Sequence, residues 1–353
     1  MNTLAHFGFG CALLVLVGCS DSPDRSGGST EPSVPGAVRE LIDDAVKSGF
    51  SGAILLTADG KELTSEAHGL ADRDRETANT PDTAFDVGSI LKSVTATAIF
   101  RLTEDDVVTL DTTLTEVFPD VPDDKAEITL RQLIQHRAGL DEYHDTMGDF
   151  ESMTRLEARA RIFEQELLFE PDTDEAYSNS GYTLLADVLE TVSGEPYVDF
   201  VRRAVLEPAD MSSSGFYSEP LWQDVDTALG YESETFGDND PATWPYTWAL
   251  VGNGGLVTTV GDLERFIMAL FGGRIVTQAT LDVMREVYFS AGEATLGGEP
   301  VYAEAGAGDF GLGGVAVFAP ESDTRIIIAT NTYDAFDVES LATELAVQLL
   351  EPN

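Results

Sequence analysis

Ser89 and Lys92 are the pair of side chains in this sequence best suited to chemistry. They stand three residues apart in the segment FDVGSILKSVTATAI, and in a helix this spacing places them one turn apart on the same face. A serine hydroxyl is a weak nucleophile that needs a base, and a lysine amine in a desolvated pocket has its pKa lowered enough to help. Because the chain has only four lysines and the neighbours of Lys92 are mostly apolar, the pair indicates a nucleophilic serine rather than a surface lysine.

Tyr177 and Asn179 form a second polar group, in the tripeptide Tyr-Ser-Asn. A tyrosine can relay a proton if nearby positive charge lowers its pKa, and an asparagine amide can both donate to and accept from an ester or amide. On its own, such a tripeptide is more often a turn at the start of a helix.

Together with these residues, several segments give the chain a specific resemblance. It is similar to the serine β-lactamase and penicillin-binding-protein superfamily, in the branch that holds class C β-lactamases, D-alanyl-D-alanine carboxypeptidases and family VIII esterases. The segments are FDVGSILKSVTATAI, ITLRQLIQHRAGL, AYSNSGYTLLADVLE, EPADM and GNGGLVTTVGDLERF. They run in the family's order and spacing, and the resemblance covers the chain from about residue 35 to the end.

The resemblance implies a role for each of these side chains. Ser89 would be the acylated nucleophile and Lys92 its activating partner, Tyr177 the general base or proton relay, and Asn179 the residue that orients the substrate. The oxyanion hole would combine the Ser89 backbone N–H with one from a strand at the far edge of the pocket. The implied reaction is acyl transfer in two steps, attack by Ser89 with release of an alcohol or amine and then hydrolysis by water. It needs no metal and no organic cofactor.

The sequence departs from the family at the third motif, where a lysine or histidine of K-T-G or H-x-G stands on a strand facing the nucleophile. The nearest match is EAG at 304–306, because no lysine follows Lys125 and no histidine follows His144. Gly306 still suits a close approach of backbone to substrate. The missing cation normally helps to hold the carboxylate of β-lactams and peptide C-termini, and Glu304 would repel it. We therefore expect neutral esters or amides to be preferred.

Three functions remain open. The first is an esterase-like hydrolase of small ester or amide substrates. The second is a D-alanyl-D-alanine carboxypeptidase or β-lactamase that acts on cell-wall peptides or β-lactams. The third, motivated by the altered third motif, is a non-catalytic envelope protein that binds a peptide or another envelope partner, although the intact Ser89, Lys92, Tyr177 and Asn179 speak against it. Arg325 could supply the missing charge from a neighbouring strand, but an exposed strand arginine is the more common situation.

These side chains require a scaffold, and the apolar pattern predicts one. It indicates helices at 35–48, 89–102 and 338–350 and a mostly helical region from 130 to 203. Asp59-Gly60 predicts a β-hairpin over 52–69, and apolar β-branched segments at 314–318 and 325–330 predict another. Strands near both ends around a helical middle indicate one sheet with an inserted helical region. With the resemblance, we expect an α+β, β-lactamase-like fold, in which helices flank an antiparallel sheet and a helical subdomain is inserted.

The composition of the 353-residue chain is globular but strongly acidic. Hydrophobic residues make up 43%, charged residues 24%, and the formal net charge is -43. Nucleic acids would be repelled, so they are not expected as partners. Because the acid is dispersed and lysine is scarce, the composition favours adaptation to high salt, which screens self-repulsion. The alternative is a moderately acidic secreted protein from a low-salt habitat.

The N-terminal residues resemble an export signal. An apolar run at 7–18 is too short to span a bilayer and ends in Leu16-Val17-Gly18-Cys19, similar to a bacterial lipobox. We expect residues 1–19 to be a lipoprotein signal peptide, 20–34 a flexible linker and 35–353 the hydrolase domain. Lipidation of Cys19 would anchor the protein in the cell envelope and be its only membrane attachment. Since the first six residues lack Lys and Arg, the alternative is a hydrophobic helix packed on the domain.

Overall fold

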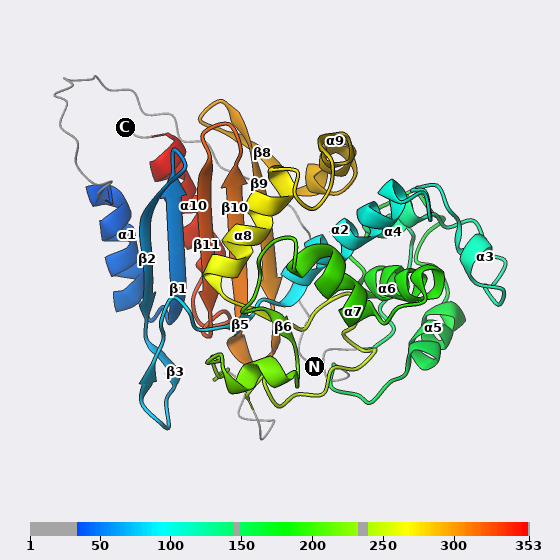
Figure 1. Ribbon diagram of the computed structural model, residues 1–353, viewed down its shortest axis with the longest axis horizontal. Helices are drawn as coiled ribbons and strands as arrows, with labels where there is room; N and C mark the ends of the chain where they lie inside the picture. Colours follow the sequence, from blue (N-terminus) through cyan, green and yellow to red (C-terminus); the bar gives the residue numbers. More distant parts are fainter. Residues whose placement is uncertain (1–33, 145–148, 232–238, 352–353) are drawn as a thin grey trace.

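A six-stranded antiparallel sheet joins the two ends of the chain in the computed structural model, which describes residues 34–144, 149–231 and 239–351. The strand order is β2-β1-β11-β10-β9-β8, so the N-terminal hairpin pairs with the C-terminal one through β1 and β11 (Figure 1). The strands are β1 (Gly52–Ala58), β2 (Lys61–His68), β8 (Glu293–Leu296), β9 (Glu299–Ala307), β10 (Gly313–Ala319) and β11 (Thr324–Thr330). Both predicted hairpins are confirmed.

Both faces of the central strands are buried. Successive side chains of a strand point to opposite faces, and each face packs against a core of its own. Ile54 and Ile328 pack in one core with the helices α1 (Gly36–Lys47) and α10 (Val338–Leu350). Leu55 and Ile327 belong to the larger core on the opposite face, where α8 (Val260–Phe271) contacts β1 and β11. Continuous apolar, β-branched segments are typical of strands covered on both sides, and this pattern predicted β10 and β11, whereas the turn at Asp59-Gly60 predicted the hairpin of β1 and β2.

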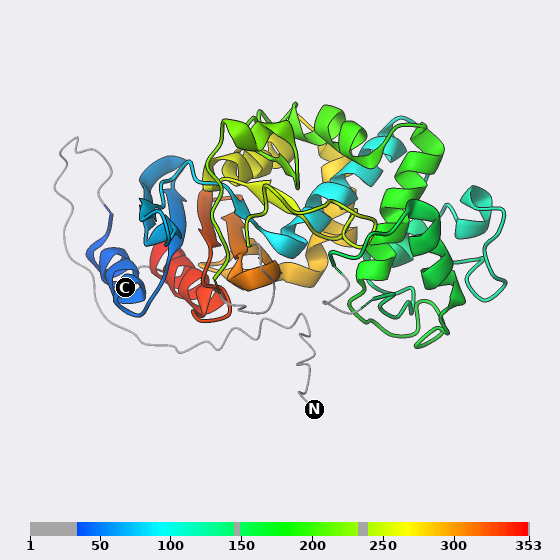
Figure 2. The ribbon, with the colours of Figure 1, turned by 90° about the horizontal axis from the view of Figure 1, so that it is seen from below.

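A helical region lies beside the sheet, as the sequence predicted. Its helices are α3 (Leu114–Val117), α4 (Leu130–Ile134), α5 (Arg155–Glu164), α6 (Asn179–Ser193) and α7 (Tyr197–Val201), and α9 (Gln278–Val287) follows α8. Two small sheets lie apart from the main one: β3 (Leu70–Asp72) with β4 (Thr77–Ala78), and β5 (Phe85–Asp86) and β6 (Gly215–Phe216) on either side of β7 (Leu256–Thr258). Figure 2 shows α2 (Leu91–Glu104), in cyan, between the sheet and the green helices.

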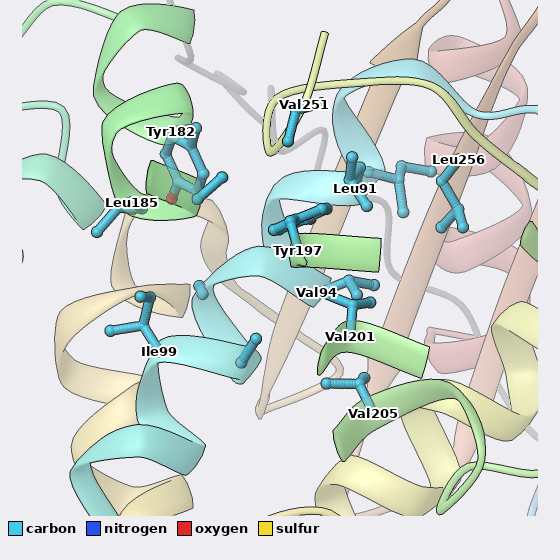
Figure 3. Packing of buried hydrophobic residues seen from close by; sticks show 14 of the residues in the cluster. Leu91, Val94, Ile99, Tyr182, Leu185, Tyr197, Val201, Val205, Val251 and Leu256 are labelled. Carbon is cyan, nitrogen blue, oxygen red and sulfur yellow. The ribbon is translucent and has the colours of Figure 1, made fainter. Parts of the chain in front are cut away.

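The helix α2 is buried on all sides. From Leu91 to Phe100 every residue is buried, the polar Lys92, Ser93, Thr95 and Thr97 included, so the helix passes through the core rather than along its surface. Figure 3 shows Val94 and Ile99 of this helix among side chains such as Leu185 of α6 and Val201 of α7. The predicted helices at 35–48, 89–102 and 338–350 are confirmed as α1, α2 and α10, so the fold is the α+β architecture expected.

The structure corrects the interpretation of Arg325 as an exposed strand arginine. Its side chain is only 4% exposed, its Nε donates to Glu264 Oε1 at 2.9 Å, and its Nη1 bonds Asp323. Both acidic partners hold the guanidinium on the sheet, so its charge is already neutralised there.

Cys19 lies outside the described residues, and within them no helix has the length and apolarity needed to cross a membrane.

Core packing predicts the cost of truncating Leu185. This side chain is fully buried in α6, and a Leu→Ala change leaves a cavity that costs about 2–5 kcal/mol. Leu185→Ala should therefore lower the free energy of unfolding by about 3 kcal/mol in denaturant titration. Leu156→Ala is the matched control, because Leu156 is 60% exposed in α5. Similar losses in the two variants would contradict this account of the core.

Candidate active site

Ser89, Lys92 and Tyr177 meet at the start of α2. Ser89 lies in the short helix η1 (Gly88–Ile90) that leads into α2, and the Lys92 Nζ donates to its Oγ at 3.0 Å. The Ser89 Oγ also lies 2.6 Å from the Tyr177 hydroxyl, and the Lys92 ammonium sits 4.8 Å from the centroid of the tyrosine ring. Ser89 is partly exposed, whereas Lys92 is only 3% exposed. The nucleophile is therefore open to a substrate while its partner is shielded from water.

The turn before Ser89 is held by a residue that the sequence did not single out, Asp86. Its Oδ1 accepts from the Gly88 backbone N–H at 2.9 Å and its Oδ2 from the Tyr217 hydroxyl at 2.6 Å. Gly88 has φ +51°, and a Cβ there would stand 2.1 Å from the Ala307 carbonyl oxygen. Glycine is thus required both by the backbone conformation and by the close approach of β9. An acidic residue beside an apolar segment was the only signal for Asp86.

Gly306 lies directly against the nucleophile, at the strand edge where the third motif was placed. A Cβ at this position would stand 2.1 Å from the Val87 carbonyl oxygen and 2.6 Å from the Ser89 nitrogen. Only glycine lets β9 approach η1 this closely. The next N–H along the strand, that of Ala307, is the candidate to complete an oxyanion hole with the Ser89 N–H.

His136 positions Tyr177. Its Nδ1 accepts from the backbone N–H of Ser178 at 3.1 Å, and its ring packs against the tyrosine ring at an interplanar angle of 30°, with centroids 4.8 Å apart. Burial lowers the pKa of His136 to about 3, and Lys92 adds to the decrease. The imidazole is therefore neutral and serves as an acceptor. Ser178 in turn begins α6, because its Oγ accepts from the Gly181 N–H.

Asn253 and Glu142 contact Lys92 and Asn179, respectively. The sequence did not single out either residue. The Asn253 carbonyl oxygen accepts from Lys92 Nζ at 2.8 Å; the segment GNGGL contains it, but a backbone acceptor has no residue-type signature. Glu142 Oε1 accepts from the backbone N–H of Asn179 at 2.9 Å. Asn179 is partly exposed beside the three central residues, and its role in orienting a substrate stays a prediction.

Electrostatics assign different tasks to Lys92 and Tyr177. Burial lowers the pKa of Lys92 to about 7. The nearby carboxylates of Glu142, Asp149 and Glu304 oppose this decrease without cancelling it. Burial raises the pKa of the Tyr177 phenol above its usual range, and Glu142 and Glu304 raise it further. Near neutral pH the amine can lose its proton while the phenol keeps its own. Lys92 is thus the group able to accept the Ser89 proton, and Tyr177 can only relay one.

Glu304 occupies the place of the missing basic residue. It lies on β9 two residues before Gly306, is partly exposed, and accepts a hydrogen bond from the Tyr288 hydroxyl at 2.9 Å. Burial raises its pKa to about 7, an effect opposed by this hydrogen bond and by Lys92.

Among the described residues, no group of three or more His, Cys, Asp or Glu side chains is arranged to hold a metal ion.

Because Lys92 must be neutral to take the Ser89 proton, kcat/KM for a neutral ester should rise with pH through an apparent pKa of about 7. Glu304 raises the pKa of Lys92, so Glu304→Gln should move this acidic limb to lower pH. The measurement is the pH–rate profile of both proteins at constant ionic strength.

The control is Glu293→Gln, which removes an exposed charge from β8 in the same sheet. Its acidic limb should coincide with that of the wild type, since Glu293 is not among the groups that act on Lys92. A limb that stays unchanged in Glu304→Gln would show that another group controls the rate.

Comparison with known proteins places this arrangement in a family. A family model described as Beta-lactamase matches residues 38–350. The putative penicillin-binding protein PbpX of Bacillus subtilis is 29% identical over 258 residues, 73% of this chain and 63% of that protein. A D-aminopeptidase of Brucella anthropi is 27% identical over 235 residues, 63% of this chain and 43% of that protein. The chain thus spans less than two thirds of the length of these two relatives.

The fold agrees with this comparison. The octameric penicillin-binding protein homologue from Pyrococcus abyssi superposes with a TM-score of 0.77 and 23% sequence identity, over 90% of this chain and 77% of that one. The match to the family model extends from α1 to the end of α10 and includes the segments that carry Ser89, Lys92 and Tyr177. The chain belongs to the beta-lactamase family.

Proposed function

We propose that this protein is a serine hydrolase that cleaves esters and amides through an acyl-enzyme on Ser89. The observation that carries the proposal is the position of the Ser89 Oγ, 3.0 Å from the Lys92 Nζ and 2.6 Å from the Tyr177 hydroxyl. A nucleophile, a base and a proton relay within hydrogen-bond distance of one another are what acyl transfer requires.

The residues divide the reaction between them. Neutral Lys92 accepts the hydroxyl proton as the Ser89 Oγ attacks the substrate carbonyl, and the oxyanion forms beside the backbone N–H groups of Ser89 and Ala307. When the bond to the leaving group breaks, Tyr177 passes a proton to the departing alcohol or amine and is reprotonated from Lys92. Water then attacks the acyl-enzyme by the same route in reverse and frees Ser89.

Among possible substrates, those without a carboxylate next to the scissile bond fit the site best. Glu304 stands where a cation would hold such a carboxylate, and like charges in a partly desolvated site repel. This supports an esterase-like activity over a carboxypeptidase or β-lactamase activity. The similarity to a D-aminopeptidase supports including amides in the substrate range.

The Ser89 assignment is tested by hydrolysis of p-nitrophenyl butyrate in molar KCl, the salt being chosen for the net charge of -43. Ser89→Ala should lose at least about a thousandfold in kcat/KM, because the nucleophile of a catalytic unit carries most of its rate enhancement. Ser65→Ala, on β2 and remote from the site, is the matched control. Equal rates in wild type and Ser89→Ala, with both folded by circular dichroism, would refute the acyl-enzyme.

We also propose that the protein is exported and lipid-anchored, on the basis of the lipobox-like segment ending at Cys19. In a bacterial host, Cys19→Ser should abolish incorporation of labelled palmitate and release the protein from the membrane fraction. Cys11→Ser, within the apolar run, is the matched control and should still be labelled. Labelling that persists in Cys19→Ser would refute the anchor.

A further inference from the structure

Glu304 has an unusual combination of position and surroundings. It lies on β9 two residues before Gly306, which brings this strand against Ser89, and it also lines a small apolar cavity with Ile90 and Phe289 that does not include Ser89, Lys92 or Tyr177. Among the described residues, only the Tyr288 hydroxyl donates a hydrogen bond to it, although a carboxylate has two oxygens with about four acceptor positions. The carboxylate is therefore partly desolvated, near the reacting atoms, and has acceptor capacity to spare.

The positively charged groups around Glu304 do not neutralise the charge of its carboxylate. Its charge is stabilised by Lys92, but Lys92 must be neutral when it acts as a base. Glu142, whose Oε2 is buried without a hydrogen-bond partner among the described residues, adds negative charge beside Lys92, as does Asp149, which lies 3.3 Å from His144 Nδ1. Arg325, on the same sheet, is held by Glu264 and Asp323. With Lys92 neutral, the carboxylates beside it leave an excess of negative charge around the pair formed by Ser89 and Lys92.

An excess of negative charge favours the binding of a cation. A carboxylate that is partly removed from water binds a positively charged group more strongly than an exposed one does. The ring of Tyr288, whose hydroxyl bonds Glu304, adds an aromatic surface of the kind that attracts ammonium groups.

We propose that this site selects substrates with a positively charged nitrogen within a few bonds of the scissile carbonyl, and that Glu304 is the residue that selects them. The inference rests on the proposed hydrolysis of esters and amides and adds the charge of the substrate to it. The nitrogen could belong to the acyl group or to the leaving alcohol, and both share the same chemistry.

Two pairs of esters test the proposal, each consisting of a quaternary ammonium compound and its neutral carbon isostere. Butyrylcholine and neohexyl butyrate place the group on the leaving alcohol. The methyl ester of trimethylammoniobutyrate and its tert-butyl isostere place it on the acyl side. Turnover is followed by proton release at a pH well above the pKa of about 7 of Glu304. The wild type should prefer the cationic member of at least one pair by about tenfold in kcat/KM, the scale of a hydrogen bond to a charged group.

Two variants of Glu304 test whether this residue causes the preference for the cationic ester. In Glu304→Gln the ratio of cationic to neutral turnover should fall towards one, whereas Glu304→Asp, which keeps the charge, should retain part of it. Glu293→Gln, exposed on β8, removes one unit of net charge elsewhere and should keep the full ratio. A general effect of protein charge would lower the ratio in Glu293→Gln as much as in Glu304→Gln and would overturn the assignment.

The outcomes separate the inference from the proposed function. If neutral esters are hydrolysed without a preference for either cation, or if the preference is undiminished in Glu304→Gln, the inference is wrong and the hydrolase proposal stands. If none of these esters is hydrolysed and p-nitrophenyl butyrate is not hydrolysed either, both are wrong. Should Glu304→Gln fail to fold, inhibition of neohexyl butyrate turnover in the wild type by choline and by neohexyl alcohol replaces it. Stronger inhibition by choline supports the inference, and equal inhibition overturns it.

Discussion

The burial of one amine, that of Lys92, is the constraint on which the site depends. Its Nζ has only the Ser89 hydroxyl and the Asn253 carbonyl as hydrogen-bond partners among the described residues, so the charged form is poorly compensated and the neutral form is favoured. That environment requires α2 to be enclosed, which α6, α7, α9 and the helical segment Arg202–Leu206 provide. The inserted helical region thus does more than cover the sheet, because it removes water from the base.

The same enclosure decides what Tyr177 can do. In a site with a second cation, a phenol could ionise and act as a base. Here burial raises the pKa of the phenol, and the carboxylates of Glu142 and Glu304 raise it further because they stabilise the protonated form. His136 cannot supply a positive charge because it is buried and neutral. The catalytic division of labour therefore follows from the sign of the charges around the hydroxyl.

The acidic residue Glu304 in the site has a different effect from the many acidic residues on the protein surface. Most of the acidic residues are exposed, where solvent and salt weaken their interactions. Glu304 is held near the nucleophile by the strand that Gly306 brings against Ser89. A single acidic residue in this place has more influence on substrate choice than many on the surface, because it is close to the scissile bond and partly desolvated.

The sequence by itself determined the elements and the central residues. Periodicity predicted α1, α2, α10 and both hairpins, because a one-sided or fully buried element imposes its repeat on the apolar residues. The spacing of Ser89 and Lys92 predicted their contact, since three residues make about one helical turn. The tertiary structure alone decided how Asp86, His136 and Asn253 support them, and that Arg325 is buried in an ion pair. These contacts join residues far apart in the chain, or use backbone atoms that every residue type carries, so no local pattern records them.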